Sequence, residues 1–258
     1  MSFQNNTPNH LITFQIMNLK ELDFDQFYKR WALIASIMHG VCLILVIFFY
    51  AQTMIWGITS LLLFGIYIVK MAYHIPSLPL WFGYANWVSI LRLMCVLCLF
   101  FFHPFIKDIY LFWGFLGAIL LDGVDGFLAR RFKQASRVGE ILDMEIDAFM
   151  VLILSWIHFN QGNTHWSILI PGFFKYIYEI VVYLAPGEEK EILPKRVRST
   201  IAVIFFLTLL IPFITDQYFG HIMLYISGVL ILISFCLSFY GRIVPQENSF
   251  DSYIKRKD

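Results

Sequence analysis

Eight long apolar stretches constrain this chain more than any other feature of its sequence. A helix needs about 20 apolar residues to cross a bilayer. Of the 258 residues, 59% are hydrophobic and only 14% are charged, whereas a soluble domain is nearer half apolar and a quarter charged. We therefore predict an all-α integral membrane protein, a bundle of about eight transmembrane helices with short connections. The stretches cover residues 31–50, 54–72, 86–103, 110–128, 139–158, 166–186, 199–215 and 221–241.

The distribution of Lys and Arg predicts the orientation of this bundle, because cytoplasmic loops carry an excess of both. If Arg130 and Arg131 lie in the cytoplasm, so do both termini and 16 of the 19 basic residues. Lys107 is then the single basic residue on the outside, while Arg92 and Lys175 lie within helices. We therefore expect both termini, and the end of the bundle near Arg130, on the cytoplasmic side.

The two ends of the chain are polar. Residues 1–27 predict a cytoplasmic N-terminal arm, either an interfacial helix or a disordered tail. The acids Glu21 and Asp23 in this arm argue against a signal peptide. Residues 244–258 predict a cytoplasmic C-terminal tail. A net charge of +1 argues against nucleic acid as a partner, so membrane lipids are the expected surroundings.

Four aspartates lie where a membrane helix should carry none. A carboxylate within a bilayer helix costs about 2.5–3.5 kcal/mol and usually marks function. Asp122 and Asp125 lie three residues apart near the end of the fourth stretch, and Asp143 and Asp147 lie four apart early in the fifth. Residues at these spacings share one face of a helix. Two neighbouring helices would therefore bring four carboxylates together.

Four neighbouring carboxylates repel one another unless a cation joins them. Oxygen ligands suit Mg²⁺ or Mn²⁺, and four acids could hold two such ions about 3.5–4 Å apart for displacement at phosphorus. The alternative is an acid network or a proton path, as in transporters. The small residues Gly126, Ala129 and Gly139 leave a slot beside the acids, and Arg130 suits a phosphate. This combination favours a site for a nucleoside diphosphate.

The same segment carries a family signature. Residues 122–147 read DGVDGFLARRFKQASRVGEILDMEID, which is DxxDGxxAR, eight residues, then GxxxDxxxD. This pattern resembles the complete signature of the CDP-alcohol phosphotransferase family. Weaker similarity extends from Asn86 onward, so the resemblance implies a six-helix catalytic core at 86–243, preceded by two additional transmembrane helices at 28–85. It also implies metal ligands at Asp122, Asp125, Asp143 and Asp147, a general base at Asp147, and nucleotide-binding residues at Asp122, Gly126, Ala129, Arg130 and Gly139.

Polar residues also open the third stretch. Asn86, Ser89 and Arg92 follow one another at a spacing of three, close to one helix face. Family members often carry Asn, Thr and Arg at this spacing, so Ser89 is a mild departure. We expect these side chains to contact the nucleotide or the acceptor. The alternative is helix capping plus one arginine that extends to the membrane surface.

Two further pairs of charges are candidates for substrate binding. Arg196 and Arg198 lie in PKRVRST, residues 194–200, and either hold an anionic acceptor or lipid phosphate or supply cytoplasmic positive charge. Lys175 and Glu179 lie four apart in the sixth stretch. They either pair with each other or allow Glu179 to bind an ammonium head group.

Glu145 also lies within the motif segment. It is two residues from both Asp143 and Asp147, so it points away from them around a helix. We expect its partners to be water, lipid head groups or a second subunit.

These features predict transfer of a phosphatidyl group from CDP-diacylglycerol to a small hydroxyl acceptor, with release of CMP, in phospholipid biosynthesis. The expected location is the cytoplasmic face of a membrane, the inner membrane in a bacterium, with two Mg²⁺ or Mn²⁺ ions as cofactors. The alternatives are the same chemistry with a soluble CDP-alcohol donor and a lipid acceptor, or a cation transporter with intramembrane acids. The acceptor alcohol stays open, and the resemblance also admits a homodimer.

Overall fold

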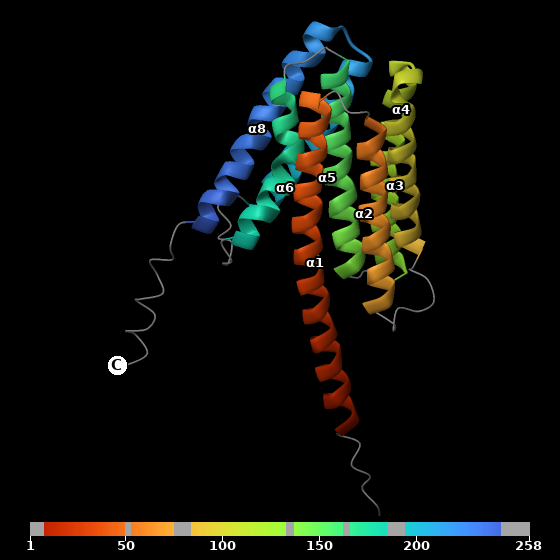
Figure 1. Ribbon diagram of the computed structural model, residues 1–258, viewed down its shortest axis with the longest axis vertical. Coiled ribbons are helices and arrows are strands. Elements are labelled where there is room, and N and C mark those ends of the chain that lie inside the picture. The colour runs from red at the N-terminus through yellow and green to blue at the C-terminus, as the bar shows by residue number, and fades with distance from the viewer. Residues whose placement is uncertain are drawn as a thin grey trace, which may run out of the picture.

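The computed structural model describes residues 8–49, 53–74, 84–132, 137–161, 166–184 and 194–243, and the predicted C-terminal tail lies outside them. These residues form eight α-helices joined by short connections or 3₁₀ turns, with no strand among them. The predicted all-α membrane bundle is thereby confirmed (Figure 1). The helices are α1 Pro8–Phe49, α2 Thr53–His74, α3 Tyr84–Phe102, α4 Asp108–Arg131, α5 Arg137–Asn160, α6 Leu169–Leu184, α7 Lys195–Leu210 and α8 Gln217–Ile243.

Within the described residues, five segments are long and apolar enough to cross a membrane. They are 26–48 in α1, 86–105, 108–131, 196–213 and 218–240. The remaining helices depart from this pattern for physical reasons. The apolar part of α2 is shorter, Ile55–Lys70, α5 carries acids through its first turns, and α6 has 16 residues, which gives it a length of about 24 Å.

Helix α5 forms the centre of the bundle and packs against α3, α6 and α7. Its second half is apolar on nearly every side, and Phe149, Leu152, Leu154 and Ile157 are all buried. A helix that is apolar all round belongs in a protein interior. This buried half follows directly on the first turns of α5, which carry Asp143, Glu145 and Asp147.

Helices α1 and α2 pack onto this core through aromatic side chains. Trp31 of α1 donates a hydrogen bond from Nε1 to the Leu63 carbonyl oxygen of α2 at 3.0 Å. Its ring lies 4.7 Å from that of Tyr67. Trp56 of α2 packs edge-on against Trp156 of α5, with ring centroids 5.6 Å apart. The two N-terminal helices are therefore part of the same bundle as the other six.

The N-terminal arm differs in part from the prediction. Helix α1 already begins at Pro8 and continues without a break to Phe49, so the first membrane helix and most of the arm are one element. Its first half extends past the rest of the bundle (Figure 1). The sequence change near residue 27 marks a change of surroundings rather than the end of a helix.

Candidate active site

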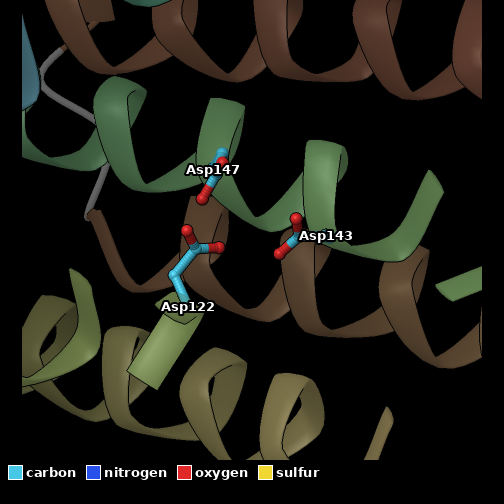
Figure 2. Close-up of side chains that lie close together, drawn as sticks. All are labelled: Asp122, Asp143 and Asp147. Carbon is cyan, nitrogen blue, oxygen red and sulfur yellow. The ribbon is translucent and has the colours of Figure 1, made fainter. Parts of the chain in front are cut away.

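Three aspartates meet where the end of α4 lies beside the beginning of α5. Asp122 comes from α4, and Asp143 and Asp147 come from successive turns of α5. Their carboxylates point toward one another (Figure 2), and one oxygen from each lies within 4.8 Å of the others. These side chains are 40%, 39% and 35% exposed, so the cluster is open on one side. The predicted meeting of acids from these two helices is confirmed for three of the four motif aspartates.

Arg92 of α3 pairs with all three acids. Its guanidinium donates to Asp122 and Asp143 through Nη1 and Nη2, and Nη1 lies 3.4 Å from Asp147 Oδ1. The Arg92 side chain is fully buried, so the alternative that it extends to the membrane surface is wrong. We call Arg92, Asp122, Asp143 and Asp147 the front cluster.

Asp125, the fourth acid of the motif, has a different partner. It is 5% exposed, and its Oδ2 accepts a hydrogen bond from Ser89 Oγ of α3 at 2.8 Å. It is absent from the group of acids whose oxygens converge within 4.8 Å in the described residues. Ser89 therefore contacts the acidic motif itself, and a metal ligand at Asp125 stays a prediction. Asn86, on the same face of α3, is also buried.

The residues predicted to line the nucleotide slot lie in the last turns of α4 and, for Gly139, in the first turn of α5. A methyl group added at Gly126 would lie 3.6 Å from Arg130 Nη1, so the exposed Arg130 side chain folds back beside this glycine. Ala129 and Gly139 are each half-buried. The structure thus places the guanidinium of Arg130 next to a position without a side chain, and nucleotide binding by these residues stays a prediction.

A cavity of about 220 Å³ opens beside the front cluster between α4, α5 and α7. Asp122 and Asp147 line it, and most of its other walls are apolar. These wall residues were not predicted from the sequence, because they carry no charge that would mark them within a membrane helix. The signal was present in α7, where the residues recur three or four apart on one face. The remaining lining residues are Ile119, Met150, Ser199, Ala202, Val203, Phe206 and Leu207.

The other candidate charges lie in two different places. Arg196 is exposed and Arg198 is half-buried in the first turn of α7, close in sequence to Ser199 in the cavity wall. Lys175 and Glu179 of α6 instead face Glu145, which lies on the opposite side of α5 from Asp143 and Asp147. Their expected role in substrate binding stays a prediction, and their position does not favour it.

The expected partners of Glu145 are wrong. Its side chain is 2% exposed, and it pairs with Lys175 and accepts a hydrogen bond from Tyr28 at 2.8 Å. Sequence spacing gave the direction of the side chain correctly but not the helices that cover it.

The front cluster has the chemistry of a divalent metal site. It offers oxygen donors from two helices, and its three carboxylates outnumber the single positive charge of Arg92. Hard cations such as Mg²⁺ or Mn²⁺ take such donors, keep some water, and also bind substrate phosphates. A partly exposed cluster with excess negative charge fits such an ion.

The fold and this site define an integral membrane bundle with an acidic, open centre at one end. The chain belongs to the CDP-alcohol phosphatidyltransferase family, whose model matches residues 82–239. The match begins just before α3 and includes the whole front cluster, whereas α1 and α2 lie outside it.

Curated relatives match parts of the chain. It is 39% identical over 71 residues to the CDP-diacylglycerol–glycerol-3-phosphate 3-phosphatidyltransferase of Sodalis glossinidius, which covers 26% of this chain and 37% of that protein. Proteins of the same name from Yersinia pestis and Yersinia pseudotuberculosis are 32% identical over 109 residues, or 38% of this chain and 54% of theirs. The chain spans about half the length of these Yersinia relatives. No solved structure matches it.

Proposed function

We propose that this protein transfers a phosphatidyl group from CDP-diacylglycerol to a small alcohol and releases CMP. The observation that carries this proposal is the front cluster, in which three acids converge and two of them, Asp122 and Asp147, line a cavity with mostly apolar walls. The charged diphosphate of a CDP-linked lipid can lie at the acids, and its apolar part can lie against the cavity wall. Family membership and the names of the curated relatives support the same reaction.

The acids would act on the diphosphate of the donor. Asp122, Asp143 and Asp147, with Asp125 as a further ligand, would hold one or two Mg²⁺ or Mn²⁺ ions. When bound, such ions neutralise the diphosphate and the charge that develops on the CMP leaving group. Arg130 would bond the diphosphate oxygens from the end of α4, and the space beside Gly126, Ala129 and Gly139 would hold the cytidine.

Asp147 would act as the general base. As the acceptor oxygen attacks the β-phosphorus, Asp147 takes the hydroxyl proton. The bond from that phosphorus to the bridging oxygen breaks, and CMP leaves with the electron pair. Asp147 suits this role because it lines the cavity and lies farther from Arg92 than the other two acids do.

The cavity and α7 suggest how the substrates are arranged. The apolar wall of Val203, Phe206 and Leu207 suits the glycerol backbone and first carbons of a lipid tail, which would enter sideways between helices. Arg196 and Arg198 precede this wall and suit an anionic acceptor. Glycerol 3-phosphate is therefore our first candidate, in agreement with the names of the curated relatives. We place this end of the bundle on the cytoplasmic side because of its Lys and Arg excess.

The products of the purified protein test the donor and the acceptor together. The protein is incubated with CDP-diacylglycerol and Mg²⁺ or Mn²⁺, and glycerol 3-phosphate, serine, inositol phosphate, choline and ethanolamine are added separately. We expect CMP and one new phospholipid, formed with glycerol 3-phosphate. A parallel reaction supplies a soluble CDP-alcohol and diacylglycerol instead, and product formed only there would reverse the assignment of donor and acceptor. No CMP with any pair would contradict the proposal.

A further inference from the structure

A second charged cluster lies on the other side of α5. Glu145 is two residues from Asp143 and Asp147, which places it about 200° from each around the helix. Its partners are Lys175 and Glu179 of α6 and Tyr28 of α1. We call Tyr28, Glu145, Lys175 and Glu179 the back cluster.

The bonds of the back cluster join three helices. Tyr28 Oη lies 2.8 Å from Glu145 Oε1 and 3.2 Å from Glu179 Oε1, so one hydroxyl is shared between two carboxylates. Lys175 pairs with Glu145, and its Nζ lies 3.7 Å from Glu179 Oε1. Close packing of α6 on α5 makes this possible. A methyl group added at Gly172, one turn before Lys175, would lie only 3.2 Å from the Leu152 Cα atom of α5.

The hydroxyl of Tyr28 is the only part of this cluster that comes from outside the family match, which begins at residue 82. A carboxylate as buried as Glu145 is stable only when its partners are complete. Helix α1 is therefore bonded to the same two turns of α5 that carry Asp143 and Asp147. On the opposite side of these turns, the guanidinium of Arg92 forms ion pairs with both aspartates.

We propose that Tyr28 is a positioning residue for the front cluster. By bonding Glu145 from α1, its hydroxyl fixes the rotation of the first turns of α5, and thereby the direction in which Asp143 and Asp147 face Asp122. The additional N-terminal helix is then part of the catalytic unit. The turnover and Mn²⁺ parts of the test below rest on the proposed function, whereas the hydrogen-exchange part does not.

The chain provides a matched pair of variants for this test. In Tyr28→Phe the ring keeps its neighbours, Trp31 at 6.4 Å and Tyr67 at 6.5 Å between centroids, and only the hydroxyl is lost. Tyr176 of α6 is also buried and lies beside Lys175, whose Nζ is 5.6 Å from its ring centroid. Its hydroxyl has no hydrogen-bond partner within the described residues. Tyr176→Phe is therefore the control.

Both variants and the wild type are purified as full chains in detergent and compared at a temperature at which all three are folded. Hydrogen exchange is measured on peptides from residues 139–149, and Mn²⁺ affinity by electron paramagnetic resonance. We expect Tyr28→Phe to exchange about five- to tenfold faster in this segment. We also expect its Mn²⁺ Kd to rise and its kcat to fall, each by about fivefold, with KM for CDP-diacylglycerol within about twofold. Tyr176→Phe should match the wild type.

Two results would overturn the proposal. One is a hydrogen-exchange rate in residues 139–149 of Tyr28→Phe that equals the rate in the wild-type protein. The other is faster exchange with unchanged Mn²⁺ affinity, because Tyr28 would then only anchor α1. If the wild-type protein released no CMP, the proposed transfer would fail, while exchange and Mn²⁺ affinity would still decide the role of Tyr28. If the wild type bound no Mn²⁺, exchange within 139–149 relative to the Tyr176→Phe control would decide it.

Discussion

The front and back clusters lie on opposite sides of the same two turns of α5, yet they differ in exposure and in charge balance. The three front carboxylates are 35–40% exposed and share one arginine. The back carboxylates are 2% and 13% exposed and share one lysine and a tyrosine hydroxyl. The front cluster has two more acids than bases and is open, which suits a ligand that brings positive charge. The back cluster has one more acid than base and is closed, which suits the joining of helices. Helix α5 thus carries the proposed metal ligands on one side and the ion pairs that join it to α1 and α6 on the other.

Asp147→Asn should produce the largest loss, because it removes the proposed base without changing the size of the side chain. We expect CMP release to fall by about 10²- to 10⁴-fold. Thermal unfolding in detergent should stay close to that of the wild type, which serves as the control for folding. Normal turnover in this variant would end the assignment of the base.

Lys175→Met tests the opposite side of the helix. It leaves Glu145 buried with one partner fewer, which costs about 3–5 kcal/mol when a buried pair is broken. We therefore expect a large drop in the unfolding temperature. Glu145→Gln with Lys175→Met removes both charges and should recover most of this loss. If Lys175→Met is as stable as the wild type, the back cluster does not hold the helices together.

Asp143→Asn and Asp122→Asn should change the response to metal rather than the fold. Each removes one charged oxygen ligand from the front cluster, so the Mg²⁺ concentration for half-maximal activity should rise by about 10- to 100-fold. Activity measured across a Mg²⁺ titration checks this. An unchanged response in both variants would argue against a metal at these acids.

Gly126→Ala should have the smallest effect of the series and should spare stability. The added methyl would meet Arg130 only at an ordinary contact distance of 3.6 Å, but it would enter the space proposed for the nucleotide. We expect binding of CDP to weaken by about tenfold, as for a misplaced ligand contact, measured by calorimetry. Gly123→Ala is the matched control, since no described atom lies within 4 Å of its added methyl. Equal CDP affinity in the two variants would show that the nucleotide does not bind beside Gly126.

The sequence predicted the elements better than their contacts. Apolar length located the eight helices of the described residues. Spacing predicted four acids in one cluster, and the structure brings together Asp122, Asp143 and Asp147, while Asp125 bonds Ser89 instead. Spacing also put Ser89 and Arg92 on one face of α3. This face meets the acids because of the way α3 packs against α4 and α5. The periodicity of a single helix carries no information on such packing.

The same limit explains the other misses. The direction of Glu145 followed from its position in α5, but the helices that cover it did not. Helix α1 begins at Pro8 rather than near residue 31, because a helix can continue after its surroundings change from membrane to water. The apolar cavity wall of α7 was missed because its residues look like any membrane helix until a neighbouring helix leaves a gap.

Removal and return of the metal tests the central claim most directly, that the front of α5 is a metal-dependent transfer site. Purified protein is treated with EDTA, and CMP release from CDP-diacylglycerol is measured with glycerol 3-phosphate before and after Mg²⁺ or Mn²⁺ is restored. The account predicts that CMP release stops without metal, returns with it, and requires the acceptor. CMP release that continues at the same rate in EDTA would contradict it.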